Sequence, residues 1–366
     1  MALAPGGVYA APAKGVVLNR FCSADLAPES AFNNKQSGLG YDGRIYLNGE
    51  EAAPEGRAFA HTLDGTSYEL PALGRMAWEN ALANGSTGDK TVVVNMDDNA
   101  AAGEVYVYVG TKESSGNPAE RAGLTGGTLY GVRVPGLAGD RETDATFPAP
   151  GSRFELVSLG DVSAKTGAGI QEESTTKGIT KWQRPEDGSW DPKSPEDFYW
   201  VTTADNDLRS RLWRFRFDDP SRPELGGTVD MLIDGTEGVE MMDNMTVDRH
   251  NRVLISEDPG GDPTPARTWS YDIKRDELTL LTAQSQLVAG ETAPSGTNYT
   301  GYTTEDEEVS GIIPLEGVLP AGWCLFDAQI HQAFAAGEAN GVKLVEKGQL
   351  TAMYFPIGQG NGLDDR

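Results

Sequence analysis

The sequence predicts an all-β fold of the β-propeller type, with five or six blades. Short apolar runs that end in acidic residues recur along the chain, and a second β-rich run follows each of them after a loop. These acid-tipped runs are Arg44–Glu51, Thr91–Asp98, Phe198–Asp205 and Val253–Asp258. Their acids Glu50, Asp97, Asp205 and Glu257 are separated by 47, 108 and 52 residues. A repeat of roughly 50 residues with several strands per unit is typical of propeller blades.

The composition supports many short strands joined by turns. The chain has 366 residues, with 45 Gly and 21 Pro, and it shows almost no helical periodicity. We expect residues 1–20, rich in Gly, Pro and Ala, to be loosely ordered, and residues 21–366 to form a single propeller domain. A ring that is incomplete at the N-terminus and is closed by another segment is an alternative.

The charge excludes one class of partner. The net charge is −25 and the pI is near 4.4, whereas binding to nucleic-acid phosphates requires a basic face. The first residues do not combine a basic region with an apolar run, and no apolar stretch approaches the length that spans a bilayer. We therefore expect no nucleic-acid partner and no transmembrane segment, and the sequence gives no oligomeric state.

The first third of the chain contains an acid-tipped strand within residues 38–51 and a hairpin over 57–71, with its turn at Asp64-Gly65. Arg75 and Glu79 follow, four residues apart, a spacing that pairs side chains on a helical turn. Such a pair is either an ordinary surface ion pair or a functional one, in which Glu79 binds a metal and Arg75 clamps an anion.

The middle of the chain contains two further strand pairs, at residues 91–110 and 195–217. Between them lies Arg184-Pro185-Glu186. Because proline cannot extend a central strand, we expect a rigid turn there, which holds a guanidinium and a carboxylate side by side.

The stretch 243–261 predicts a hairpin with a buried second strand over Arg252–Ser256. Asp243 and Asn244 precede it, and Glu257 and Asp258 follow it. Carboxylate and amide oxygens suit a hard cation such as calcium, although acids at these positions also cap turns. If acid-tipped strands are the innermost strands of their blades, their acids converge at the channel and need a cation between them.

Further strands are expected at Glu277–Leu281, Ser310–Ile313, Trp323–His331 and Leu350–Phe355. The two cysteines, Cys22 and Cys324, form either a disulfide or two free buried thiols.

Six segments jointly resemble the PhoX-type alkaline phosphatases and their uncharacterised PhoX-like (DUF839) relatives. They are RIYLNGEE (44–51), LGRMAWE (73–79), VVVNMDD (92–98), QRPED (183–187), DNMTVDRHNRVLISED (243–258) and WCLFDAQIH (323–331). The resemblance implies a β-propeller phosphatase that hydrolyses phosphate monoesters outside the cytoplasm, with calcium and iron at the axial end of the channel.

The resemblance also implies site residues. Arg184, and with it Arg75, would stabilise phosphate oxygens, and Glu186 would act in catalysis and as a metal ligand. The remaining implied ligands are Glu50, Glu51, Glu79, Asp97, Asp98, Asp243, Asn244, Glu257 and Asp258. Gly49 stands where the family has an iron-binding cysteine, so calcium is the expected cofactor and iron the alternative.

Three functions follow as hypotheses. The first is a metal-dependent phosphomonoester hydrolase that acts on a small phosphorylated substrate in an extracellular or periplasmic setting. The second is a non-catalytic, calcium-stabilised propeller for binding or assembly. The third is a metal-dependent esterase or lactonase on a similar propeller.

Overall fold

The computed structural model describes residues 2–4, 8–11, 17–100, 103–140, 147–205, 207–261, 265–283, 307–333 and 346–357. The chain divides into two compact units, which are described separately below. The first comprises Met1–Ala204 and Arg211–Asp234, and the second comprises Asp205–Ser210 and Gly235–Arg366. None of the helices described is long and apolar enough to cross a bilayer.

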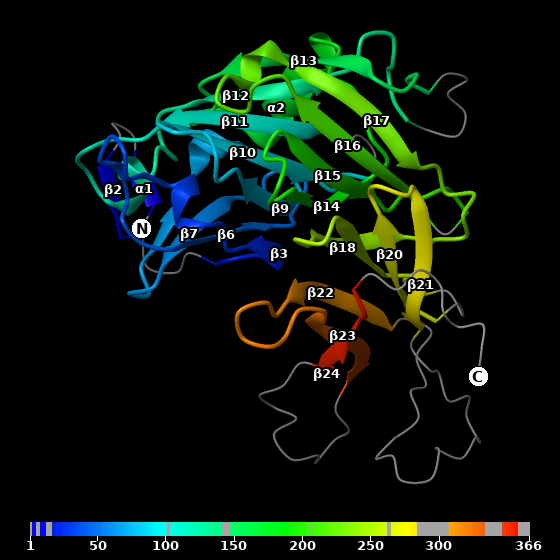
Figure 1. Ribbon diagram of the computed structural model, residues 1–366. Helices are drawn as coiled ribbons and strands as arrows, with labels where there is room; N and C mark the ends of the chain where they lie inside the picture. The colour runs from blue at the N-terminus through cyan, green and yellow to red at the C-terminus, as the bar shows by residue number, and fades with distance from the viewer. Residues whose placement is uncertain are drawn as a thin grey trace, which may run out of the picture. The chain divides into compact units, whose positions relative to one another are not determined.

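The first unit begins with a four-stranded antiparallel meander (Figure 1). Its strands, in spatial order, are β3 (Phe21–Asp25), β6 (Ile45–Glu50), β7 (Ala58–Thr62) and β8 (Ser67–Glu69). The hairpin predicted over 57–71 is therefore confirmed as β7 and β8.

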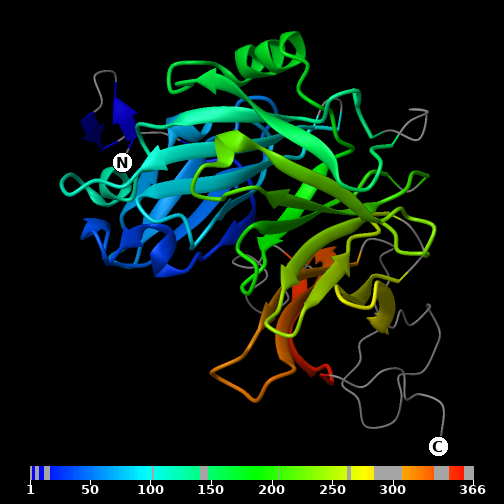
Figure 2. The same cartoon turned by 45° about the horizontal axis from the view of Figure 1, so that its top comes forward.

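A nine-stranded sheet forms the rest of the first unit, and it consists of two meanders joined at their last strands (Figure 2). The first meander contains β9 (Trp78–Ala83), β10 (Lys90–Asp97), β11 (Val105–Thr111), β12 (Thr128–Arg133) and β13 (Ser152–Gly160). The second contains β14 (Pro185–Trp190), β15 (Asp197–Thr202), β16 (Arg211–Phe217) and β17 (Gly227–Ile233). The join is antiparallel and pairs Ser152 with Val229 and Phe154 with Gly227.

Short elements complete the description of the first unit. They are β1 (Ala2–Ala4), β2 (Val8–Ala10), β4 (Asn33–Asn34), β5 (Leu39–Gly40), the 3₁₀ turns η1 (Glu29–Ala31), η2 (Pro71–Leu73) and η3 (Pro223–Leu225), and the helices α1 (Pro118–Arg121) and α2 (Gly167–Thr176). A capping box between Asn117 and Glu120 starts α1, and the Thr166 hydroxyl caps α2.

The second unit contains two more meanders. One consists of β18 (Met242–Val247), β19 (Arg252–Glu257), β20 (Arg267–Asp272) and β21 (Glu277–Ala283), and the other of β22 (Glu308–Pro314), β23 (Trp323–Ala333) and β24 (Glu346–Tyr354). Asn251, with φ of 64°, occupies the left-handed position of the β18–β19 turn. The hairpin predicted for residues 243–261 is confirmed.

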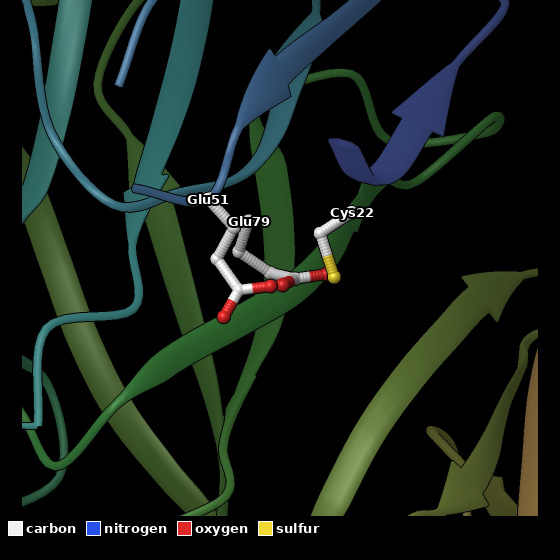
Figure 3. Close-up of side chains that lie close together, drawn as sticks. All are labelled: Cys22, Glu51 and Glu79. Carbon is white, nitrogen blue, oxygen red and sulfur yellow. The ribbon is translucent and has the colours of Figure 1, made fainter. Parts of the chain in front are cut away.

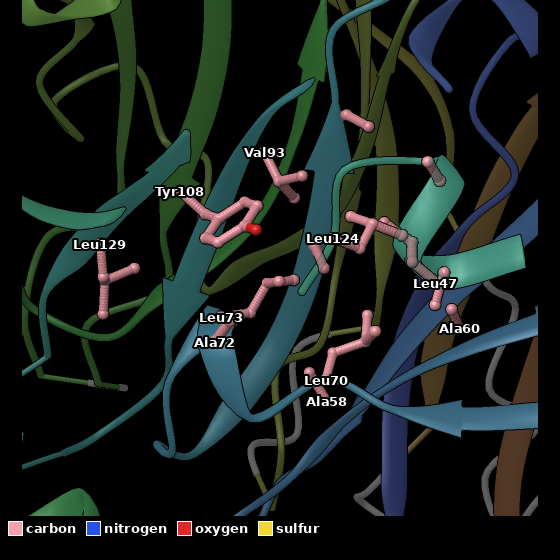
Figure 4. Packing of buried hydrophobic residues seen from close by; sticks show 14 of the residues in the cluster. Leu47, Ala58, Ala60, Leu70, Ala72, Leu73, Val93, Tyr108, Leu124 and Leu129 are labelled. Atoms are coloured by element: carbon pink, nitrogen blue, oxygen red, sulfur yellow. The ribbon is translucent and has the colours of Figure 1, made fainter. Parts of the chain in front are cut away.

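Alternation along each strand divides the core of the first unit into two clusters on opposite faces of the sheet. Val93 packs with Tyr108, Leu73 and Leu47 in one cluster (Figure 4), while Val92 and Val94 pack in the other. Successive side chains of a strand point to opposite faces, so a strand such as β10 serves both clusters. This explains why Val92, Val93 and Val94 are all apolar instead of alternating with polar residues.

The repeat read from the sequence is confirmed, with one correction. The four acid-tipped runs are β6, β10, β15 and β19, and the run after each is its antiparallel partner, β7, β11, β16 or β20. These acid-tipped strands are the second strands of their meanders, so the assumption that they are the innermost ones is wrong. Recurring antiparallel meanders agree with the predicted β-propeller class. The division into a loosely ordered start and one domain stays a prediction.

Candidate metal centre

The first strands of the meanders in the first unit converge around a group of donor side chains. Strand β9 lies beside β3, β6 and β14. Cys22, Glu79 and Glu186 are each the second residue of their strand, β3, β9 and β14 respectively. An equivalent position in three adjacent strands therefore supplies a thiol and two carboxyls to one region.

Cys22, Glu51 and Glu79 point toward one another (Figure 3), with one donor atom of each within 4.8 Å of the others. Glu51 directly follows β6 and is held by a backbone bridge to Ala77, next to β9. A carboxylate of Glu186 and one of Glu79 also lie within 4.8 Å of each other. Three carboxyls and a thiol at these separations form a donor set suited to a metal ion.

Burial makes this cluster electrostatically costly without a cation. Glu79 is 1% exposed, and burial raises its pKa to about 7, helped by the charges of Asp98 and Glu51 and opposed by hydrogen bonds to Cys22 and Ser23. Burial also raises the pKa of Glu51, against the charge of Arg20. Oε1 of Glu79 is buried and takes no hydrogen bond from any residue that the structure describes. Buried polar atoms are normally hydrogen-bonded, so a buried carboxylate oxygen without a hydrogen bond is consistent with a metal ligand.

A guanidinium lies at the edge of the cluster. Arg184 donates from Nε and Nη2 to the two carboxylate oxygens of Asp98, both at 2.8 Å, and its Nη2 lies 3.3 Å from Oε1 of Glu186. The predicted side-by-side placement of Arg184 and Glu186 is thus present. The predicted rigid turn is wrong, because Pro185 is the first residue of the edge strand β14, a position where its missing N–H is tolerated.

The backbone of Arg184 is itself unusual. Its φ is 57°, in the left-handed region that residues with a Cβ seldom adopt. The amide of Arg184 donates to the Trp182 carbonyl at 3.0 Å, and its carbonyl accepts from Thr203 at 3.1 Å. The surrounding backbone therefore holds this conformation in place.

The structure corrects the prediction for Arg75. Residues 78–83 form strand β9, so Arg75 and Glu79 do not pair on a helical turn. Arg75 instead binds Glu69 at 3.2 Å and the carbonyl of Glu55 at 3.5 Å.

Three predicted ligands of the first unit are not among the clustered donors: Asp98, which pairs with Arg184, and Glu50 and Asp97. Glu50 forms a two-pronged ion pair with Arg57, in which Nε lies 2.7 Å from Oε2 and Nη2 lies 2.5 Å from Oε1. Asp97 accepts from the Ala77 amide at 2.9 Å and from Gln171 at 2.6 Å. Burial, followed by the neighbouring Glu104 carboxyl, raises the pKa of Asp97 well above its usual range.

The second unit contains another acidic cluster. Donor atoms of Asp243, Asp258 and Glu308 lie within 4.8 Å of one another. Asn244 supports the cluster, since its amide donates to Asp243 at 2.6 Å and its oxygen accepts from the Gly311 amide at 2.5 Å. The structure thus brings together the two acidic ends of the β18–β19 hairpin.

Glu308 is a member that sequence reasoning missed. Burial raises its pKa, against a hydrogen bond to His331 and with the Asp258 charge raising it further. His331 Nε2 lies 3.5 Å from Oε2 of Glu308.

Glu257 is not part of this second cluster. Its carboxylate binds Arg267 through Nε at 2.7 Å and Nη2 at 2.9 Å, and it accepts from the Trp269 indole at 2.9 Å.

Cys22 is the other residue that sequence reasoning did not place in the site. A signal for it exists in the sequence: Cys22, Glu79, Glu186 and Asp243 each follow the apolar first residue of the first strand of a meander, namely Phe21, Trp78, Pro185 and Met242. Both cysteines are free thiols, Cys22 half-buried and Cys324 buried.

Comparison with known proteins gives a fold likeness and no sequence relative. No family model matches the chain, and no curated protein matches it. Among solved structures, it is similar to Pseudomonas fluorescens PhoX in complex with vanadate, a transition-state analogue, with a TM-score of 0.58 and 16% identity. The match covers 82% of this chain and 57% of that one, so the chain spans less than two thirds of the PhoX chain. The likeness confirms the resemblance to PhoX in fold.

Two further structures match over much of the chain but superpose poorly. The first is the AtxE2 isopeptidase, with a TM-score of 0.27 and 11% identity, and the match covers 92% of this chain and 52% of that one. The second is the tricorn protease, with a TM-score of 0.23 and 9% identity, and the match covers 87% of this chain and 35% of that one. At these TM-scores neither likeness carries an argument about this chain.

Proposed function

We propose that this chain is a metal-dependent phosphomonoester hydrolase. The observation that carries the proposal is the guanidinium of Arg184 beside the buried carboxyl of Glu186, which in turn lies beside the carboxyl of Glu79. A metal ion held by carboxylates and an adjacent arginine are cationic groups that stabilise the charge on a transferring phosphoryl group. The PhoX-like fold supports the proposal by analogy alone.

The metal ligands in the first unit would be Glu51, Glu79 and Glu186. The buried oxygen of Glu79, which no described residue hydrogen-bonds, fits a cation. The carboxylates alone would suit calcium, and the nearby Cys22 thiol would suit a transition metal. A metal held by these residues would supply positive charge to phosphate oxygens and would lower the pKa of a water molecule. In the second unit, Asp243, Asp258 and Glu308 form a donor set that also fits calcium.

Arg184 would bind the substrate. Its planar guanidinium suits two forked hydrogen bonds to phosphate oxygens, and Asp98 holds that plane through its own pair of 2.8 Å contacts. Asp98 is therefore a positioning residue. Nothing in the contacts of Arg75, which binds Glu69, favours its implied role as a second clamp.

The partner would be a small phosphorylated molecule. We place the protein outside the cytoplasm, in an extracellular or periplasmic setting, as the family resemblance implies.

Turnover of p-nitrophenyl phosphate, a generic phosphomonoester, tests the proposal. The protein is assayed with calcium, with iron, with both ions and with a chelator. Glu186→Ala is expected to lose about 100-fold or more in kcat/KM while it keeps its circular dichroism spectrum. The matched control is Glu172→Ala, an exposed glutamate on α2, which should keep full activity. Unchanged turnover in Glu186→Ala would overturn the assignment.

A second function is a non-catalytic propeller stabilised by calcium. The observation that favours it is that Glu50 and Glu257, two of the implied ligands, form ion pairs with arginines and so have a structural role. Calcium binding without turnover of any phosphomonoester would support this second function.

A further inference from the structure

We propose that the thiol of Cys22 is a metal ligand, which binds one transition-metal ion together with Glu51 and Glu79. The proposal deepens the proposed function because it concerns the same centre. It rests on that metal centre and does not require hydrolytic activity.

The geometry already gathers the three donors. Cys22 comes from β3, Glu51 from the end of β6 and Glu79 from β9, and their donor atoms lie within 4.8 Å of one another (Figure 3). Donors that share one ion at about 2.0–2.3 Å lie roughly 3–4 Å apart. Closing the site around an ion therefore needs side-chain movements of about 1 Å, without any change of strand pairing.

Glu79 gives independent support for a ligand at this point. Its side chain is 99% buried, and its Oε1 takes no hydrogen bond from the residues that the structure describes. An ion between this oxygen and the Cys22 sulfur would satisfy it. The Cys22 thiol already hydrogen-bonds the Glu79 carboxyl, so sulfur and carboxylate face each other.

Packing explains why the sulfur cannot come from position 49. A Cβ placed on Gly49 would lie 2.2 Å from Cβ and 2.3 Å from Cγ of Trp78. Trp78 is fully buried, so it cannot move aside cheaply. Any side chain at position 49 is thus excluded, whereas the adjacent strand β3 can supply the sulfur at Cys22.

A thiolate changes the kind of metal that the site selects. Calcium and magnesium take oxygen ligands, whereas iron, zinc and cobalt accept sulfur. On binding, the Cys22 S–H bond breaks, the sulfur forms a bond to the metal and the proton passes to water, so no redox partner is needed. The first-unit centre is therefore expected to hold a transition metal, and the all-oxygen cluster of the second unit a hard cation.

Cobalt(II) is a direct probe, because a thiolate ligand gives it an intense near-ultraviolet charge-transfer band that carboxylates do not give. The metal-free full chain is titrated with cobalt(II). The wild type is expected to show the band at one ion per chain. Cys22→Ser should lose it and bind cobalt at least 10-fold more weakly, whereas Cys324→Ser, the matched control, should keep both. Gly49→Cys in the Cys22→Ser background should not restore the band.

An alkylation experiment on the wild type tests the proposal even if the Cys22→Ser variant does not fold. Wild-type protein is treated with iodoacetamide with and without zinc, and the modified cysteine is identified by mass spectrometry. Zinc is expected to slow modification of Cys22 at least 10-fold. Equal rates, a band that survives in Cys22→Ser, or cobalt bound by the wild type without the band would each overturn the proposal.

The outcome is separable from that of the proposed function. A charge-transfer band in a protein that hydrolyses no phosphomonoester supports the thiolate ligand and contradicts the hydrolase. Hydrolysis that depends on metal, without the band, supports the hydrolase and contradicts the thiolate ligand.

Discussion

At the scale of single residues, burial shifts the pKa of side chains in a way that their neighbours in the sequence do not indicate. Lys112 is 1% exposed, and its ammonium donates to the carbonyl of Gly88 at 2.8 Å and to that of Lys90. Burial lowers the pKa of Lys112 to about 8, and the charge of Asp89 only partly offsets this. The same cause acts in the opposite direction on Glu79, because its charged form is the anion.

Lys112 predicts a rise in stability at alkaline pH. Its folded pKa of about 8 is below the ordinary 10.5, so between these values the folded state binds fewer protons than the unfolded state. The free energy of unfolding should therefore increase with pH across this window, by about 1–3 kcal/mol. Urea unfolding at several pH values should show this increase in the wild type and not in Lys112→Met. Lys90→Met, which removes an exposed lysine, is the control, and a rise of the same size in Lys112→Met would contradict the prediction.

At the scale of elements, one arginine–glutamate arrangement recurs between second and third strands. Glu50 ends β6 and Arg57 precedes β7, while Glu257 ends β19 and Arg267 starts β20. In both pairs Nε lies 2.7 Å from Oε2, and the arginine amide donates to the same oxygen, at 3.2 Å and 3.1 Å respectively. The acid tip of a strand thus fixes the start of the next strand in two meanders.

Breaking one of these pairs should be costly. Arg267→Met leaves the fully buried Glu257 carboxylate uncompensated, which is expected to lower the free energy of unfolding by about 3–5 kcal/mol. Adding Glu257→Gln should recover part of the loss, because the amide oxygen is neutral and still accepts from Trp269. The control Arg275→Met removes an exposed pair with Asp272 and should cost about 1 kcal/mol or less. Guanidinium denaturation measures all three, and an additive effect in the double variant would contradict the explanation.

At the scale of the whole molecule, acidic clusters sit at equivalent positions of several meanders. One cluster belongs to the first unit and contains Cys22, Glu51 and Glu79, and the other belongs to the second unit and contains Asp243, Asp258 and Glu308. In each, carboxyls that are costly to ionise together become compatible once a cation lies between them. Metal binding and stability should therefore be linked in both units.

Removing metal is expected to lower the melting temperature. An ion whose free concentration is 100 times its Kd raises the free energy of unfolding by about 2.7 kcal/mol. Calorimetry with and without chelator should show a shift of several degrees that is reversed by added metal. Glu79→Gln and Glu308→Gln should each reduce the shift, because each removes a ligand from one cluster, whereas Glu172→Gln should not. Identical melting of the wild type with and without chelator would contradict the linkage.

The sequence by itself determined the strands, their repeat and many of the acids at their ends. Apolar runs tipped by acids are local patterns, so β6, β10, β15 and β19 and their partner strands could be predicted from composition and spacing. Only the tertiary structure decided which acids share a site. Glu50 and Glu257 are the last residues of their strands, and Glu51 and Asp258 directly follow them. The fold nevertheless pairs the first two with arginines and places the other two in the clusters. Likewise Cys22 is 29 residues from Glu51 and 57 from Glu79, so only strand packing could place its sulfur beside them. Strand patterns depend on neighbouring residues, whereas a metal centre depends on contacts between distant ones.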